Sequence, residues 1–304
     1  MLSEIKDIPI KAKEFLENSP DFILPTAVPY LGMGSSYFAP LAFKYMGVNI
    51  YPELASEYFN YLHKGNKLSD AVLLSQSGKS TEVLWAAELF KSFTAITNKI
   101  DSPLTQFSGA SSIVDLLAGD EKFSSSKTYI NTLLALFKGF NIDVKNAVNI
   151  LSTHENKYEQ KGKEIAEAIF SLIQQQKLNG LYITGSGPNI ATALQAALIM
   201  SESTKLNFNG LAMPQYDHGP KETAKNSVVI NIVAKGKSYD RTQKLTEAIQ
   251  QAGATVFTIE EPAVSENESV INNIVPFNYM AYYLSELLEI KDTFIVGGKV
   301  TEVK

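Results

Sequence analysis

Residues 28–36 read Val28-Pro29-Tyr30-Leu31-Gly32-Met33-Gly34-Ser35-Ser36, a short apolar run that meets a glycine-rich turn. Together with the helical segment from Tyr37 to about Tyr45, this run predicts a strand, a tight turn and a helix. Glycines in such a turn let backbone N–H groups converge on an anion. The third glycine of a dinucleotide-binding fingerprint is missing, so the motif argues against an NAD site.

The same pattern of strand, turn and helix returns later in the chain. Residues 181–188 read Leu181-Tyr182-Ile183-Thr184-Gly185-Ser186-Gly187-Pro188, and Gly185 stands 153 positions after Gly32. Further strands are expected at 49–54, 71–74, 93–98, 228–233 and 255–259, with helical segments between them. This alternation predicts an α/β protein of two tandem, doubly wound domains, produced by internal duplication, each with a parallel sheet flanked by helices.

Four segments are expected along the chain. Residues 1–24 should form a helical arm, with one amphipathic helix over 3–17 whose apolar face includes Ile10. Residues 25–145 should form the first domain, and 146–285 the connecting helices and the second domain. Residues 286–304 should hold the end of the last helix and a tail. His154, in the connecting helices, has only polar neighbours in sequence and is expected to be solvated.

Composition excludes several classes of function. A net charge of −5, without a basic patch, argues against nucleic-acid and anionic-membrane partners. The absence of cysteine excludes disulfides, a thiolate nucleophile and cysteine-type zinc sites. No leader pattern and no run of about 18 apolar residues is present, so we expect a soluble, cytoplasmic protein. The 304 residues, 45% hydrophobic, suffice for two cores.

A second glycine-containing turn is dense in hydroxyl groups. The run Ser75-Gln76-Ser77-Gly78-Lys79-Ser80-Thr81 follows the expected strand 71–74 and precedes a helix. It is suited to bind an anion, although serine and threonine also favour ordinary helix caps. Since neighbouring parallel strands end at one crevice, we expect Ser35 and Ser36 beside this run. Arg241 is the only arginine, so a phosphate would be bound mostly by hydroxyls, backbone N–H groups and lysines.

Candidate groups for proton transfer come from the second half. Glu202 is expected near the end of a helix over 190–206, among uncharged residues, where desolvation would raise the pKa of its carboxyl group. This environment suits a general base. His218 follows in a loop rich in glycine and proline, and an imidazole can transfer protons near neutral pH. The alternative is a helix-end carboxylate and a surface histidine. Lys299, after two glycines in the tail, can reach a site or lie on a frayed end.

Taken in order, these motifs resemble the sugar-isomerase (SIS) family, and in particular the isomerase half of glucosamine-6-phosphate synthases. The resemblance covers nearly the whole chain. It implies that Glu202 moves a proton between C1 and C2, that His218 opens the sugar ring and that Lys299 acts at C2. It also implies a homodimer, since the ring-opening histidine of the family comes from the neighbouring subunit, and no metal or cofactor. The residues implied to bind the sugar phosphate are Gly34, Ser35, Ser36, Ser75, Gln76, Ser77, Ser80 and Ser125.

The sequence also departs from that family. The resembled enzymes carry a glutaminase with a catalytic cysteine, so we do not expect this cysteine-free sequence to take ammonia from glutamine. Ile199, Ser201 and Asn209 stand where family members often have charged residues. The favoured interpretation is a hexose-6-phosphate aldose–ketose isomerase-type enzyme, foremost a glucosamine-6-phosphate deaminase or isomerase that forms fructose 6-phosphate and ammonia. The alternatives are a phosphoglucose or phosphomannose isomerase, a fructosamine-phosphate deglycase and a non-catalytic sugar-phosphate sensor.

Overall fold

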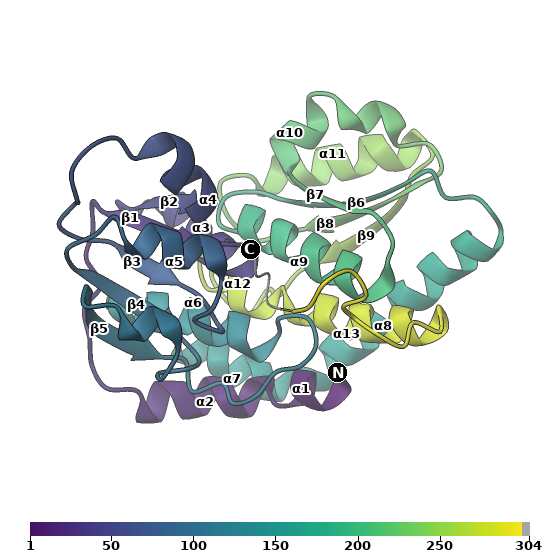
Figure 1. Ribbon diagram of the computed structural model, residues 1–304. Helices are drawn as coiled ribbons and strands as arrows, with labels where there is room; N and C mark the ends of the chain where they lie inside the picture. The colour runs from purple at the N-terminus through teal and green to yellow at the C-terminus, as the bar shows by residue number, and fades with distance from the viewer. Residues whose placement is uncertain (300–304) are drawn as a thin grey trace. The chain divides into compact units, whose positions relative to one another are not determined.

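A computed structural model describes residues 1–299 of the chain, which divides into two compact units. The first unit contains residues 7–144 and the tail from residue 295, and the second contains residues 1–6 and 145–294. Each unit is built around one fully parallel sheet (Figure 1). The prediction of parallel α/β sheets flanked by helices is confirmed.

The elements of the first unit follow one another as α2 (Ile8–Asn18), β1 (Pro29–Gly32), α3 (Ser35–Met46), β2 (Tyr51–Leu54), α4 (Ala55–Glu57), the π-helical turn η1 (Tyr58–Leu62), β3 (Val72–Leu74), α5 (Thr81–Ala87), β4 (Phe93–Thr97), the 3₁₀ helix η2 (Pro103–Gln106), β5 (Ala110–Asp115) and α6 (Lys127–Gly139). The strand order in the sheet is β2-β1-β3-β4-β5. The order reverses between β1 and β3, which is the position where open α/β sheets bind ligands.

The elements of the second unit are α1 (Leu2–Lys6), α7 (Lys145–Thr153), α8 (Glu155–Gln174), β6 (Gly180–Gly185), α9 (Asn189–Thr204), β7 (Phe208–Ala212), α10 (Met213–Asp217), the 3₁₀ helix η3 (Pro220–Thr223), β8 (Ser227–Ile232), α11 (Tyr239–Gln251), β9 (Thr255–Ile259), α12 (Ser269–Asn272) and α13 (Val275–Leu287). The strand order is β7-β6-β8-β9, so this order reverses between β6 and β8.

Both sheets are covered by helices on their two faces. In the first unit, Leu31 and Leu73 are in register on neighbouring strands and share a buried cluster with Val83 of α5. Tyr30 alternates to the other face, where its ring lies 5.9 Å from the ring of Phe140, just after α6. In the second unit, α10 and α11 share one cluster with β8, while α9 contacts β6 and β7 and packs against α13.

The two glycine turns have the same geometry, which supports the predicted duplication. A Cβ atom on Gly32 would lie 2.6 Å from the carbonyl oxygen of Ser36, and one on Gly185 would lie 2.1 Å from that of Asn189. In both copies, the clashing oxygen belongs to the residue four positions later, in the first turn of the helix. The next glycines, Gly34 and Gly187, both have positive φ angles, of 50° and 54°. Both turns therefore depend on glycine at the same two places.

Several expectations about individual elements were wrong. The single helix expected over 3–17 is two helices, because Pro9 stands in the first turn of α2 and favours a helix start there. Ile10, assigned to the apolar face, is 55% exposed. Strand β5 was not predicted, and strand β7 and helix α10 occupy part of the expected glycine- and proline-rich loop. None of the helices within residues 1–299 is both long and apolar enough to cross a membrane.

Candidate active site

The hydroxyl-rich run forms a tight loop directly after β3. The Oγ atoms of Ser75 and Ser80 lie 3.1 Å apart, and the backbone N–H of Lys79 donates to Ser77 Oγ at 3.2 Å. The N–H of Gly78 donates to the carbonyl of Ser75 at 3.0 Å. Ser75 is buried, whereas Gln76 and Ser77 are half-buried. The loop is therefore held by its own hydrogen bonds.

Gly78 makes this loop possible. Its φ angle is +61°, and an added Cβ atom would lie 1.9 Å from Ser102 Oγ and 2.3 Å from Ser102 Cβ. The N–H of Leu104 also donates to the carbonyl of Gly78 at 3.1 Å. A side chain at this position would be strained in its backbone and would collide with the turn after β4. The serine loop is thus packed against a second loop at the same edge of the sheet.

The turn after β1 lies at that edge as well. Strands β1 and β3 pair in parallel, with Tyr30 opposite Val72 and Leu31 opposite Leu73, so both strands end on the same side. Ser35 and Ser36 are half-buried at the start of α3, and Gly34 immediately precedes them. The structure therefore brings two of the predicted motifs, residues 34–36 and 75–80, to the switch point of the first sheet.

The tail lysine completes a pocket in the first unit. Lys299 Nζ donates to the backbone carbonyls of Glu121 at 2.9 Å and Phe123 at 2.6 Å, and lies 3.1 Å from Glu121 Oε2. A pocket of about 360 Å³ is lined by Gln76, Ser77, Lys79, Lys99, Asp101, Ser102, Pro103, Glu121 and Lys299. Residues from the serine loop and from the end of the chain thus line one cavity, with three ammonium groups around it.

Sequence reasoning missed Glu121. Its side chain is fully buried, and its Oε1 accepts hydrogen bonds from the N–H groups of Ser126 at 2.9 Å and Thr128 at 3.2 Å. The hydroxyls of the same two residues also donate to the carboxylate. Glu121 therefore connects the start of α6 to Lys299. A signal was present, since an acidic residue stands just before a run of hydroxyl residues that opens a helix.

The hydroxyl residues Ser124, Ser125 and Ser126, just before α6, have a structural role at this point. Ser125 Oγ lies 2.8 Å from Thr128 Oγ1, and Thr128 in turn bonds Glu121. Ser125 is not among the described residues that line the pocket. Its expected contact with substrate therefore stays a prediction.

Glu202 lies where the helical pattern placed it, in the last turn of α9, and is half-buried. The next residue, Ser203, is buried. The expectation of uncharged neighbours needs one correction, because Lys205 Nζ donates to the backbone carbonyl of Glu202 at 2.5 Å. Ile199, one of the departures from the resembled family, is fully buried.

His218 is exposed and follows α10 directly. Its neighbour Asp217 is fixed by Lys221 at 3.1 Å and Arg241 at 2.9 Å, and hydrogen bonds from Arg241 and then Lys221 lower the pKa of Asp217. Glu202 precedes β7 and His218 follows it. The serine loop and Lys299 belong to the first unit, and Glu202 and His218 to the second.

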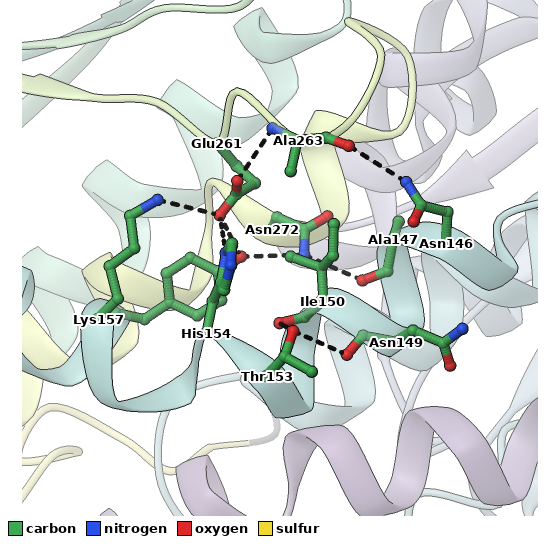
Figure 2. Close-up of polar contacts among 11 residues, drawn as sticks. Asn146, Ala147, Asn149, Ile150, Thr153, His154, Lys157, Glu261, Ala263 and Asn272 are labelled. Atoms are coloured by element: carbon green, nitrogen blue, oxygen red, sulfur yellow. Dashed lines mark hydrogen bonds and ion pairs between the residues drawn. The ribbon is translucent and has the colours of Figure 1, made fainter.

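His154 was expected to be solvated, and this expectation was wrong. Its Nδ1 lies 2.8 Å from Glu261 Oε2 (Figure 2). The same oxygen also accepts from the hydroxyl of Tyr158 at 2.8 Å. Glu261 Oε1 accepts from the N–H of Ala263 at 3.1 Å. Burial raises the pKa of Glu261, but hydrogen bonds from His154, Ala263 and Tyr158 outweigh it, so the net pKa is lowered. The residues next to His154 in sequence gave no indication of this contact, because Glu261 follows β9, far along the chain.

Comparison with known proteins adds to this geometry. No protein-family model matches the chain. In sequence it is 28% identical to the isomerizing glutamine–fructose-6-phosphate aminotransferase of Pyrococcus horikoshii over 295 residues, which cover 84% of this chain and 48% of that protein. The chain spans about half the length of the curated relatives it matches.

Two solved structures share the fold. The C-terminal domain of glucosamine-fructose-6-phosphate aminotransferase from Francisella tularensis matches with a TM-score of 0.79 at 17% identity, covering 95% of this chain and 96% of that one. Glucosamine-6-phosphate deaminase from Thermotoga maritima matches with a TM-score of 0.77 at 20% identity, covering 96% and 95%. By sequence, therefore, the chain is similar to part of the isomerizing glutamine–fructose-6-phosphate aminotransferases, and it has the fold of these two solved structures.

Proposed function

We propose that this protein is a phosphosugar isomerase-type enzyme that acts on a hexose 6-phosphate, foremost as a glucosamine-6-phosphate deaminase. The observation that carries the proposal is the pocket of the first unit, where the serine loop and Lys299 line one cavity. Hydroxyls, an amide and three lysine side chains suit a phosphorylated, hydroxyl-rich ligand. The likeness of the fold over nearly the full length of a glucosamine-6-phosphate deaminase supports the choice of substrate.

In this proposal the loop 75–80 and residues 34–36 bind the phosphate. Lys299, held by three oxygen acceptors, is a positioned cation for the developing negative charge at the reacting oxygen. Glu121 is then a positioning residue, since it fixes the ammonium without needing to touch the sugar. Only part of the loop's hydrogen-bonding capacity is available, because Ser75 and Ser80 also bond one another.

Glu202 is assigned the proton transfer. In the open aldosamine its carboxylate takes the proton from C2 and returns it to C1, while a proton moves from nitrogen to the C1 oxygen. The product is the C2 imine of fructose 6-phosphate, and water hydrolyses it to the ketone and ammonia. His218 is assigned to ring opening. It is assigned to the site of a neighbouring subunit in a homodimer, as the resemblance to the sugar-isomerase family implies.

The test is a substrate panel with a matched pair of variants. Purified protein is assayed with glucosamine, glucose and mannose 6-phosphates for ammonia release and for fructose 6-phosphate, in ordinary and deuterated water. Glu202→Gln keeps the shape but removes the base, so kcat should fall by about 10²–10⁴-fold with the fold intact. Glu164→Gln, an exposed carboxylate change on α8, is the control and should keep full turnover.

Each outcome of the assay favours one of the candidate functions. Ammonia release with solvent deuterium at C1 supports the deaminase. Ketose formation from glucose or mannose 6-phosphate, without ammonia from the aminosugar, would indicate a plain isomerase, and turnover only with fructosamine phosphates would indicate a deglycase. Binding without turnover of any substrate would favour the sensor. Near wild-type turnover by Glu202→Gln would remove Glu202 from the mechanism.

A further inference from the structure

The second sheet has its own switch point, between β6 and β8. These strands pair in parallel, with Leu181 opposite Val228 and Ile183 opposite Ile230, so the loops that follow them lie at one edge. The first loop holds residues 186–188 before α9, and the second holds residues 233–237 after β8. In the first unit, the corresponding crevice is the phosphate site of the proposed function.

A carboxylate of the chain itself lies in this second crevice. A Cβ atom added to Gly236, in the loop after β8, would lie 2.0 Å from Glu266 Oε2 and 2.3 Å from its Oε1. A Cβ atom added to Gly187, in the loop after β6, would lie 3.4 Å from the same Oε1. Glu266 therefore contacts the glycines of both loops, and its charged group fills the space between them.

The backbone of Glu266 is fixed by a buried relay of hydrogen bonds. Asn189, the first residue of α9, donates from Nδ2 to Ser269 Oγ at 2.8 Å, and Ser269 Oγ donates to the carbonyl of Glu266 at 2.7 Å. Asn189 and Ser269 are each 1% exposed. This relay holds the carboxylate segment over the N-terminus of a 16-residue helix, where the helix dipole favours negative charge.

The crevice keeps other features that attract anions. Lys235 and Lys237 flank Gly236 and are exposed. Ser186 is 9% exposed, and its Oγ has no hydrogen-bond partner among residues 1–299. A helix N-terminus, two lysines and a buried hydroxyl without a hydrogen-bond partner among residues 1–299 thus belong to the segments whose glycines Glu266 contacts.

We infer that the β6/β8 crevice is an anion site of the phosphate-binding type and that Glu266 occupies it as an internal substitute for the ligand. The comparison with the first unit rests on the proposed function, whereas the contacts of Glu266 do not. Each chain then binds one sugar phosphate, in the first unit only. Removal of the Glu266 side chain opens a second site for inorganic phosphate.

The experiment counts phosphate sites by calorimetry. The background is Ser75→Ala/Ser77→Ala, in which the proposed first site is disabled. Adding Glu266→Ala to this background should add one equivalent of bound phosphate. Glu268→Ala is the matched control, because Glu268 lies in the same segment but bonds the N–H of Ser265 instead. No added equivalent in folded Glu266→Ala protein, or an equal gain in the control, would overturn the inference.

Two further measurements separate the possible failures. If the double serine variant binds phosphate as the wild type does, the proposed function is wrong, but an added equivalent in Glu266→Ala still supports this inference. If Glu266→Ala does not fold, Glu266→Gln is used, which keeps the volume and removes the charge. Its melting temperature should be lower than that of the wild type, and the gap should shrink between about 0.1 M and about 1 M salt. A gap that is insensitive to salt would count against the inference.

Discussion

The loop after β3 and the loop after β8 hold the same place in two sheets whose first four strands follow the same order, yet their side chains differ. The first carries Ser75, Ser77 and Ser80, and its glycine faces Ser102. The second carries alanine and lysine, and its glycine faces the carboxylate of Glu266. The glycines that the turns require persist in both copies, while the groups that would contact a ligand do not. Backbone geometry and ligand chemistry are thus separable in this fold.

The largest expected effect tests whether Glu202 of one subunit and His218 of its partner act in one shared site. Glu202→Gln and His218→Ala proteins should each be inactive alone, since each lacks one group of every site. After subunit exchange, mixed dimers should contain one intact site, which restores about one quarter of wild-type activity in a random mixture. Activity of the mixture is measured against each variant incubated alone. No recovery after exchange has been demonstrated would contradict a shared site.

The next effect tests whether only one loop binds phosphate. Ser77→Ala and Ser75→Ala should each raise KM for the sugar phosphate by about 10–100-fold, because a lost hydrogen bond to a charged group costs about 1.5–3 kcal/mol. Lys235→Ala, at the matching place in the second loop, should leave KM unchanged. Steady-state kinetics measures both. An equal rise in KM for the lysine variant would break the distinction between the loops.

A smaller effect tests whether the glycine turns after β1 and β6 are equivalent. Gly32→Ala and Gly185→Ala should both destabilise the protein by about 1–3 kcal/mol, because each new methyl group meets a backbone oxygen that cannot move freely. Gly47→Ala is the control, since its φ is +93° but nothing lies within 4 Å of the added atom. It should cost only the backbone strain of about 1 kcal/mol. Urea unfolding measures all three, and tolerance of alanine in one copy alone would mean that the turns differ.

The smallest effect concerns the buried carboxylate of the second unit. Because the folded-state pKa of Glu261 is lowered, its contribution to stability is present above the unfolded-state pKa and is lost as pH falls through the folded value. Glu261→Gln should therefore be less stable than the wild type at pH 7, by about 1 kcal/mol. The difference should shrink below about pH 4. Unfolding free energies across pH measure it, and a gap that stays constant into acid would contradict the assignment.

The sequence predicted central strands better than edge strands, for a physical reason. Strands β3 and β8 are buried on both faces; β3 is an unbroken apolar run, and β8 is apolar except for Ser227 and Asn231. Strands β5 and β7 stand at the edges of their sheets, and their polar or glycine residues resemble loops. Gly210 in β7 is required because a Cβ atom there would lie 2.6 Å from the carbonyl oxygen of Ala193 in α9. Such a close approach depends on tertiary packing, which cannot be predicted from the local sequence.

The candidate site, too, was predicted only in part from the sequence. The serine loop was predictable, because its hydroxyls stand together in sequence at the end of an apolar run. The contact of Lys299 with Glu121 was not, because it joins residues far apart in the chain. The pairing of His154 with Glu261 was missed for the same reason. Local sequence patterns thus located groups that are clustered in the chain, such as the serine loop. Contacts between residues far apart in the chain became visible only in the folded structure.

The internal hydrogen bonds of the serine loop have a consequence for the energetics of ligand capture. Ser75, Ser80 and the Lys79 N–H are bonded within the loop, and the Gly78 turn is packed against Ser102. A flexible loop must lose conformational entropy when it closes on a phosphate, and that loss weakens binding. Here the loss was incurred when the chain folded. If the loop binds phosphate as proposed, the ligand would therefore meet a preorganised loop.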